Sequence, residues 1–202
     1  MSEFEINTDK TVLRYQGSFI RVETLEYHNS DGSIHHRDVV RHPGAVVVIP
    51  YLTDAKAVLL IEQYRIAANT NLAELPAGKR DIQGEDPLDC AKRELEEELG
   101  LTASSMVHLI SFYNTPGFCD EYTHLYLARG LSPGVHAPQG IEELAAKKKI
   151  LPLADFEDAM QDQKIFDAKT FLGIFALRNH LENSLDDETY VDSIDLDDFE
   201  LL

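Results

Sequence analysis

Cysteine is scarce in this chain of 202 residues, which contains only Cys90 and Cys119. The two form neither a Cys-x-x-Cys pair nor a disulfide framework, which excludes a small fold held together by disulfides. The amino terminus, MSEFEINTDK, is acidic and polar, whereas a secretory signal is basic and then apolar. We therefore expect a reduced, cytoplasmic protein.

Basic residues and long apolar runs are also in short supply. Lys and Arg total 18 against 36 Asp and Glu, which gives a net charge of −18. This is the wrong sign for holding a nucleic-acid backbone. The longest aliphatic stretches, such as AVVVI at 45–49, are far shorter than the ~20 residues that cross a bilayer. We expect neither a nucleic-acid partner nor a membrane span.

The hydrophobic residues that are present amount to 44% of the chain, which is enough for the core of one domain of ~150 residues with an appendage. Residues 4–41 alternate apolar and polar positions around the turn SDGS, which predicts a small antiparallel sheet. From Ala45 onward, short buried runs such as AVVVIPYL and AVLLIEQY predict strands of a second kind. The pattern predicts an α+β fold.

The remaining elements follow from the same periodicity. We expect two further strands around 106–113 and 122–128 and helical segments near 152–161 and 167–183. The chain is thus expected to consist of an amino-terminal sheet, a larger domain and an acidic tail, with the bounds 1–44, 45–185 and 186–202. Acidic residues in the tail usually stay solvated and mobile, while its interleaved apolar residues leave a docking role open.

The first helix has clear local signals at both ends. Asp86 can cap its amino terminus, Pro87 suits the first helical position, and Gly100 can adopt the left-handed conformation that ends a helix. Residues 87–99 are therefore predicted to be helical. At 100° per residue the helix carries one apolar stripe, formed by Leu88, Ala91, Leu95 and Leu99.

Three acidic residues, Glu94, Glu97 and Glu98, fall together on a neighbouring face of this helix, with Glu96 pointing elsewhere. Like charges at this spacing repel one another by roughly 0.2–0.5 kcal/mol per pair, and a hard divalent cation would remove the repulsion. The alternative is a solvated acidic face with Lys92 and Arg93 as local partners.

The spacing of the segment favours the cation. Glu85, Arg93, Glu94, Leu95, Glu97, Glu98, Gly100 and Leu101 coincide with the signature of the Nudix box, so residues 78–101 resemble that motif. One departure is that six residues, instead of five, separate Gly78 from Glu85, an insertion that a loop tolerates easily. The resemblance implies an α/β/α sandwich and the hydrolysis of a nucleoside diphosphate linked to another group.

The resemblance also implies roles for individual residues. Glu94 and Glu98 would be the main ligands of Mg²⁺, or of Mn²⁺, with help from Glu97 and the backbone carbonyl of Ala77. Arg93 would pair with Glu85 or Glu97 and orient the carboxylates, although a plain ion pair on the helix surface is the alternative. Glu85 and Gly78 would support the site from the loop that precedes the helix.

Within that family, the runs IEQYR, ELPAGK and TPGFCDE resemble ADP-ribose pyrophosphatases. This implies substrate contacts for Arg65 and Pro116, a substrate or metal contact for Glu74, cleavage of ADP-ribose to AMP and ribose 5-phosphate, and a homodimer joined through residues 4–41. Arg65 and Glu74 could instead be solvated residues at strand ends. Other nucleotide sugars, a dinucleotide, or a non-catalytic role as an ADP-ribose sensor remain alternatives.

A second acid cluster, at Glu142 and Glu143, matches the family position of a general base, and the sequence does not separate the two. A loop tip balanced by Lys147–Lys149 is the alternative interpretation. Cys90 is a soft ligand that suits Mg²⁺ poorly, so we expect it to pack as a small apolar group. The histidines lack metal-type spacing and are expected to be ordinary residues: His35, His36, His108, His124 and His136.

Overall fold

The computed structural model describes residues 4–165, 167–183 and 190–202. Its contacts divide the chain into two compact units. The first comprises the chain as far as Ala45 together with Lys79–Gln83 and Phe112–Thr123, and the second comprises Val46–Gly78, Gly84–Ser111 and His124–Leu202. The amino-terminal boundary predicted at residue 44 stays a prediction, because two later segments also belong to the first unit.

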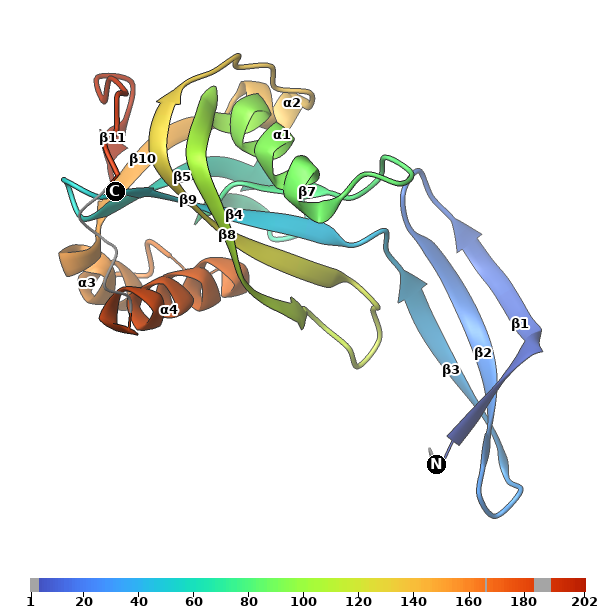
Figure 1. Cartoon of the computed structure of the whole chain (residues 1–202). Coiled ribbons are helices and arrows are strands. Elements are labelled where there is room, and N and C mark those ends of the chain that lie inside the picture. The colour runs from blue at the N-terminus through green and yellow to red at the C-terminus, as the bar shows by residue number, and fades with distance from the viewer. Residues whose placement is uncertain (1–3, 166, 184–189) are drawn as a thin grey trace. The chain divides into compact units, whose positions relative to one another are not determined.

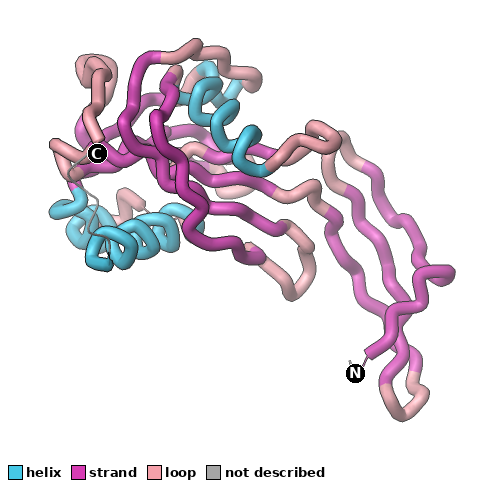
Figure 2. Tube along the Cα trace, in the orientation of Figure 1, coloured by secondary structure: helices cyan, strands magenta, loops and turns pink. Residues whose placement is uncertain are grey.

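The first unit contains a three-stranded antiparallel sheet in the order β1-β2-β3 (Figures 1 and 2). Its strands are β1 (Phe4–Gln16), β2 (Arg21–Asn29) and β3 (Ile34–Arg41). The turn between β2 and β3 contains Gly32, whose φ of 82° favours a residue without a side chain. This sheet agrees with the alternation read from residues 4–41.

The segment Phe112–Thr123 of the first unit contains a turn that contacts the end of β3. The Val40 amide donates to the carbonyl of Phe118 at 2.7 Å, and the Asp120 amide donates to the carbonyl of Val40 at 3.1 Å. Arg41 joins the two segments with side-chain contacts to Glu23 and Asp120 at 2.8 and 2.9 Å. Pro116 lies exposed in this turn, and its contact with substrate stays a prediction.

The second unit is built around a larger sheet (Figure 1). In the described part of the chain this sheet has eight strands in the order β11-β10-β5-β4-β9-β8, with β6 paired to β5 and β7 to β4. The ends of β4, β7, β8 and β9 extend into segments of the first unit. The strands are β4 (Ala45–Leu52), β5 (Ala57–Arg65), β6 (Thr70–Glu74), β7 (Ala77–Lys79), β8 (Leu101–Tyr113), β9 (Tyr122–Pro133), β10 (Lys147–Pro152) and β11 (Glu200–Leu201).

Helices cover both faces of this sheet, with α1 on one side and α3 and α4 on the other (Figure 1). From α1, the side chains of Leu95 and Leu99 pack into one buried cluster with Val46 and Val48 of β4. This layering confirms the predicted α/β/α sandwich. No described helix is long and apolar enough to cross a membrane. The helices are α1 (Pro87–Leu99), α2 (Ile141–Leu144), α3 (Phe156–Gln161) and α4 (Ala168–Asn183).

The ends of α1 lie where the local signals place them. Asp86 Oδ1 accepts a hydrogen bond from the Leu88 amide at 2.8 Å, and Gly100 has a φ of 69°. Other boundaries differ from the prediction. β8 begins at Leu101 rather than near 106. The sequence did not indicate this start because the run LTASS has little apolar periodicity, and its strand conformation comes from pairing within the sheet.

The tail is docked where the structure describes it, over residues 190–202, and residues 186–189 lie outside the described residues. Asp192 accepts hydrogen bonds from two backbone amides, those of Thr53 at 3.0 Å and Leu131 at 2.8 Å. Ile194 and Phe199 pack against the α1 side of the core. The docking role that the sequence left open for the apolar residues of the tail therefore has contacts to support it, while most acidic residues of this segment are exposed, as expected.

An Asp192→Ala substitution should loosen this docking. Each hydrogen bond to a charged acceptor contributes about 1.5–3 kcal/mol, so the free energy of unfolding should fall by roughly that amount in a urea titration. Asp198→Ala, which removes an exposed carboxylate from the same segment, is the matched control and should change stability by less than ~0.5 kcal/mol. Equal stabilities for the two variants would contradict the docking role of Asp192.

Candidate active site

The carboxylates of α1 do not form an exposed acidic face. Glu94 and Glu98 are buried, with 8% and 7% of their surface exposed, and they face Gly78 and Ala77 at the start of β7. The apolar stripe of the same helix is buried beside them, at Ala91, Leu95 and Leu99. The helix therefore turns two acidic residues toward the interior, which needs a compensating positive charge.

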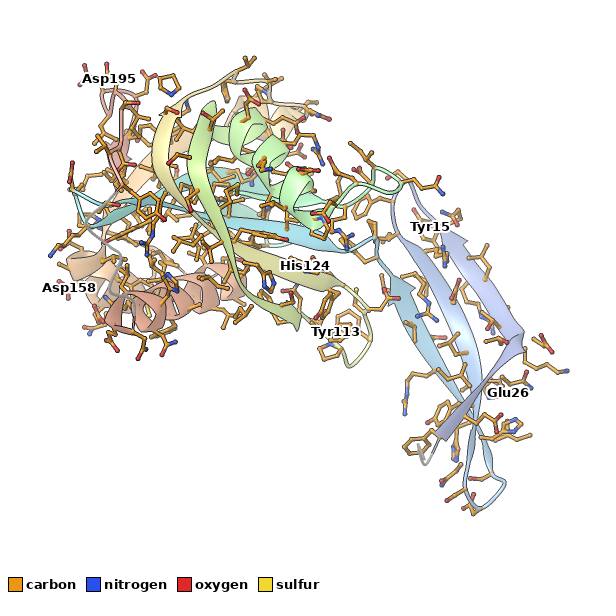
Figure 3. All side chains as sticks on the ribbon, in the orientation of Figure 1. Tyr15, Glu26, Tyr113, His124, Asp158 and Asp195 are labelled. Carbon is orange, nitrogen blue, oxygen red and sulfur yellow. The ribbon has the colours of Figure 1, made fainter. Side chains whose placement is uncertain are left out.

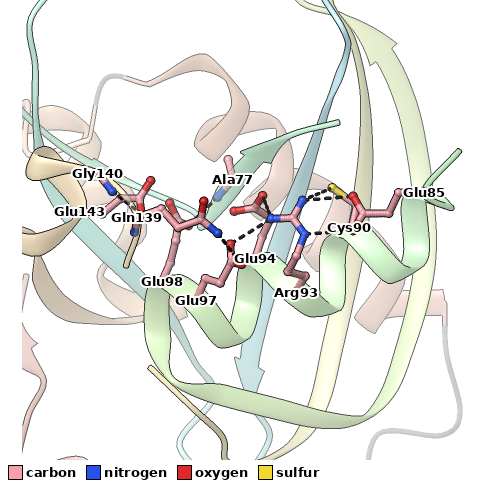
Figure 4. A network of polar contacts seen from close by, with 10 residues as sticks. All are labelled: Ala77, Glu85, Cys90, Arg93, Glu94, Glu97, Glu98, Gln139, Gly140 and Glu143. Atoms are coloured by element: carbon pink, nitrogen blue, oxygen red, sulfur yellow. Dashed lines mark hydrogen bonds and ion pairs between the residues drawn. The ribbon is translucent and has the colours of Figure 1, made fainter. Parts of the chain in front are cut away.

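Arg93 supplies part of that charge (Figure 4). Its Nε and Nη2 atoms donate to the two carboxylate oxygens of Glu85 at 2.9 and 3.1 Å. Its Nη1 atom donates to Glu94 at 2.7 Å and to Glu97 at 2.9 Å. Arg93 thus contacts both partners expected from the sequence, and Glu94 in addition, so one guanidinium orients three carboxylates.

The segment before the box shapes the other side of the site. The Ala77 amide donates to Glu98 Oε2 at 2.9 Å, which fixes the carboxylate of Glu98 (Figure 4). A Cβ atom added to Gly78 would lie 1.7 Å from Glu94 Cδ. The glycine therefore leaves the space in which the carboxylate of Glu94 lies, which explains why the motif has glycine at this position.

The electrostatics of this pair favour a bound cation. Burial raises the pKa of Glu94 to about 7, although Arg93 opposes the rise, and the charges of Glu97 and Glu143 add to it. Burial also raises the pKa of Glu98 well above its usual range, against the hydrogen bond from Ala77. Since these carboxylates are hard oxygen ligands held at high negative potential, the residues fit a divalent metal ion.

The third carboxylate is oriented differently. Glu97 accepts from Arg93 and, through its other oxygen, from Gln139 Nε2 at 2.7 Å. Among the described residues no three Asp, Glu, His or Cys side chains already converge as a metal site. The groups that could hold a metal are the carboxylates of Glu94 and Glu98 and the carbonyl of Ala77, while Glu97 is held by Arg93 and Gln139.

Substitution of Gly78 by alanine should test this fit. The added methyl group would displace the carboxylate of Glu94, the movable end of a side chain, so activity should fall by ~10–100-fold while the unfolding free energy changes by less than ~1 kcal/mol. The measurements are steady-state kinetics and urea unfolding. Gly117→Ala, where an added Cβ meets nothing within 4 Å, is the control; equal activity in both variants would contradict the assigned role of Gly78.

A loop at residues 139–144 approaches the same site. Glu143 Oε2 accepts from the backbone amides of Gln139 and Gly140 at 2.7 and 3.3 Å, and its charge raises the pKa of Glu94 and Glu98. Glu142 is exposed in the same turn. The structure thus brings Glu143 into electrostatic contact with the box, and it adds Gln139, for which the sequence carried no signal.

Arg65 and Glu74 form a pair of their own. Arg65 donates through Nε and Nη2 to the two oxygens of Glu74 at 2.8 and 2.7 Å. Glu74 is only 1% exposed, so it is not a solvated acid at a strand end. Lys169 also donates to Glu74, a contact that the sequence did not indicate, because the two residues are 95 positions apart.

The remaining candidate groups serve packing and local hydrogen bonding. Cys90 is fully buried; burial raises the pKa of its thiol to about 12, so it stays protonated, as expected for a small apolar group. His108 and His124 both contact Ser111 Oγ, at 2.7 and 2.9 Å. Within the described residues these histidines belong to no group of three or more metal-type side chains.

The fold and the site together define a class: a layered α/β/α domain whose first helix presents buried carboxylates, clamped by one arginine, for a divalent metal. A sequence model of the NUDIX domain matches residues 41–171. The chain therefore belongs to the NUDIX domain family. It is accordingly a hydrolase, and enzymes of this family generally depend on divalent metal ions.

Individual relatives agree with this assignment. The chain is 37% identical over 171 residues to a methanol dehydrogenase activator of Bacillus methanolicus, covering 85% of this chain and 91% of that protein. It is 33% identical over 169 residues to an ADP-ribose pyrophosphatase of Bacillus subtilis, covering 82% and 90%. The crystal structure of an ADP compounds hydrolase has the same fold, with a TM-score of 0.78 at 20% identity over 90% of this chain and 96% of the other.

Proposed function

We propose that the protein hydrolyses the diphosphate of ADP-ribose, or of a close ADP-sugar, to AMP and ribose 5-phosphate, with Mg²⁺ as its metal. The observation that carries the proposal is the box geometry, in which Glu94 and Glu98 lie buried beside Ala77 and Gly78. The choice of substrate is supported by the similarity to the ADP-ribose pyrophosphatase of Bacillus subtilis. Neither cysteine forms a disulfide, and both are buried, which suits the cytoplasm.

The chemistry assigns separate tasks to the residues of the site. Glu94, Glu98 and the Ala77 carbonyl would hold Mg²⁺, which would supply charge neutralisation at the phosphoryl oxygens and a more acidic water molecule. Glu143, or Glu142 in the same turn, accepts the proton of the attacking water at a carboxylate oxygen. Arg93 keeps Glu97 and Glu94 from moving as charge develops, because it donates to both.

Roles in substrate binding are proposed for Arg65, Glu74 and Pro116, with direct contacts from Arg65 and Pro116. Arg65 donates to Glu74 through Nε and Nη2, and 41% of its side chain is exposed. The other edge of the guanidinium can therefore bind an anionic oxygen. Glu74, buried beneath it, would act by holding Arg65 rather than by contacting the substrate. Pro116 belongs to the other compact unit, and its assignment depends on the family resemblance.

The test is a panel of nucleotide sugars and dinucleotides, supplied with Mg²⁺ or Mn²⁺, in which AMP and ribose 5-phosphate are assayed directly. ADP-ribose should give both products at the highest kcat/KM of the panel. Preference for a different nucleotide would replace the substrate and keep the class of reaction. Calorimetric binding of ADP-ribose without turnover would instead favour a sensor.

A second candidate function is favoured by the relative with 37% identity, which is named as an activator of methanol dehydrogenase. We infer that the protein could stimulate such an enzyme in addition to hydrolysing its own substrate. Oxidation of methanol by that dehydrogenase should accelerate when the protein is added, and a Glu98→Gln variant shows whether hydrolysis is required. An unchanged rate of oxidation would remove this candidate.

We also propose that the protein is a homodimer joined through β1–β3. These strands expose several large apolar side chains, including Tyr15, which projects from β1 (Figure 3). A three-stranded sheet is too thin to bury both faces by itself, and exposed apolar surface of this kind marks an interface. Among the large apolar residues of β1–β3, those with more than half of their surface exposed are Phe4, Ile6, Leu13, Tyr15 and Ile34.

Light scattering at micromolar concentration should therefore give about twice the chain mass of 22.8 kDa. Deletion of residues 1–41 should yield aggregated or inactive protein. Leu13→Glu, which puts a charge on an exposed apolar position of β1, should shift the equilibrium toward monomer, whereas Lys10→Glu, which alters a position that is already polar, should not. A fully active wild-type monomer would contradict the proposed assembly.

A further inference from the structure

The first turn of α4 is tied to the segment that leads into the Nudix box. Thr170 Oγ1 accepts a hydrogen bond from the Leu75 amide at 2.9 Å, and its hydroxyl donates to Asp167 Oδ2 at 2.6 Å. Thr170 is fully buried. Leu75 stands between Glu74 and the Pro76–Gly78 segment, so the helix terminus and the wall of the metal site are linked through side chains.

Lys169 makes the second link. Its ammonium group contacts the buried carboxylate of Glu74 and lies 3.0 Å from Asp167 Oδ2. Only 17% of the Lys169 side chain is exposed, although lysine is among the residues most rarely buried without a partner. The position of Lys169 is therefore set by the same turn of α4 that holds Leu75.

Glu74 thus shares its charge between two cations that come from different elements. Arg65, at the end of β5, binds both oxygens of Glu74 in a planar, bidentate arrangement, which fixes the plane of the guanidinium. Lys169 binds Oε2 of the same carboxylate. Without Lys169, one oxygen of this buried group would lose a charged partner, and the carboxylate could rotate with the arginine attached to it.

The guanidinium of Arg65 also lies near the box. Arg65 binds both oxygens of Glu74, which stands three positions before Ala77, and the Ala77 amide donates to Glu98 Oε2 at 2.9 Å. The pKa of Arg65 is itself raised, first by the hydrogen bonds to Glu74 and also by the charge of Glu98. The short segment from Glu74 to Ala77 therefore joins the guanidinium of Arg65 to the carboxylate of Glu98.

We propose that Lys169 is a positioning residue that, through Glu74, holds the Arg65 fork toward the anionic part of a bound nucleoside diphosphate sugar. This inference rests on the proposed function, because it assigns Lys169 a task in binding that substrate. Lys169 does not touch the substrate in this arrangement. Its effect passes through two ion pairs, so it should disappear when Arg65 is no longer present to be positioned.

The test is a double-mutant cycle between Lys169→Met and Arg65→Met. Arg65 would contact the phosphate in both the ground state and the transition state, so Lys169→Met should raise KM about tenfold and change kcat by less than about threefold. In the Arg65→Met background the same substitution should have almost no further effect, because the two residues act as one unit. Lys169→Arg, which keeps the charge, should restore KM to within about threefold of wild type.

Three results would overturn the proposal. They are equal kinetics for Lys169→Met and wild type, multiplicative effects of the two substitutions, or a Lys169→Arg enzyme as impaired as Lys169→Met. If Lys169→Met does not fold, Lys169→Gln replaces it in the double-mutant cycle, since the glutamine amide can still donate to Glu74 but has no charge. Lys164→Met, which removes an exposed lysine outside α4, is the matched control and should leave KM unchanged.

The wild-type enzyme distinguishes failure of this inference from failure of the proposed function. If wild type does not hydrolyse ADP-ribose, the proposed substrate is wrong, and the cycle is run with the panel nucleotide that it does hydrolyse. If it binds ADP-ribose without turnover, the cycle is run on the Kd from calorimetry. In each case the same lack of additivity supports the role of Lys169, and additive effects contradict it.

Discussion

A Glu98→Gln enzyme should fold normally and turn over its substrate on the order of 10³-fold more slowly than wild type. A Lewis acid held in place contributes several kcal/mol to phosphoryl transfer, and each ~1.4 kcal/mol is a factor of ten in rate. Glutamine keeps the shape of the side chain and can still accept the hydrogen bond from Ala77. The loss should therefore appear in catalysis rather than in folding.

Stability measurements make this expectation specific to metal binding. Burial raises the pKa of Glu98, so replacing its carboxylate with an amide should not lower the melting temperature of the metal-free protein. Wild type should be stabilised by millimolar Mg²⁺, because a ligand that binds only the native state raises its stability by mass action. The Glu98→Gln variant should show little of this stabilisation.

Glu96→Gln is the matched control, because it makes the same chemical change on the same helix. Glu96 Oε1 accepts a hydrogen bond from the Val135 amide at 2.9 Å, which glutamine can also accept. This variant should retain both its turnover and its response to Mg²⁺. Near-normal activity in a folded Glu98→Gln protein would remove Glu98 from the metal site.

The parts of the fold that the sequence predicted are those specified by neighbouring residues. The helix over 87–99 was predicted at both ends, because Asp86, Pro87 and Gly100 act within one turn of the chain. The strands of residues 4–41 were predicted for a similar reason, since alternation and a Gly-containing turn are local. By contrast, β11 pairs over only two residues with β10, and so short a strand has no periodicity to detect.

In the candidate site, too, the sequence predicted the contacts between neighbouring residues and missed those that depend on distant segments. The spacing of the box located Arg93 among its acidic partners, because positions three and four apart on a helix are neighbours. It did not predict that Glu94 and Glu98 are buried, since that depends on Ala77 and Gly78, which approach from outside the helix. Nor did it indicate Gln139, which reaches Glu97 across 42 residues of sequence.

The two loop glutamates, which sequence alone did not separate, should differ strongly in their effects on catalysis. We expect Glu143→Gln to lower kcat by about 10²–10⁴-fold, the usual contribution of a general base, and Glu142→Gln to remain close to wild type. The reason is that Glu143 lies near enough to the box for its charge to raise the pKa of Glu94 and Glu98. Glu142 is exposed in the same turn.

The defect should also differ in kind from that of a box variant. A general base removes a proton and holds no metal, so Glu143→Gln should keep the Mg²⁺ concentration for half-maximal activity and the KM of wild type, whereas Glu98→Gln should lose its metal dependence. Glutamine can still accept the amides of Gln139 and Gly140 through its carbonyl oxygen, so an unchanged melting temperature shows that the turn is intact. If Glu142→Gln is instead the impaired enzyme, the base is Glu142.

If both single variants and the double variant keep more than about a tenth of wild-type kcat, the loop supplies less than the typical contribution of a base. The proton acceptor must then be sought in the box, at Glu94 or Glu97.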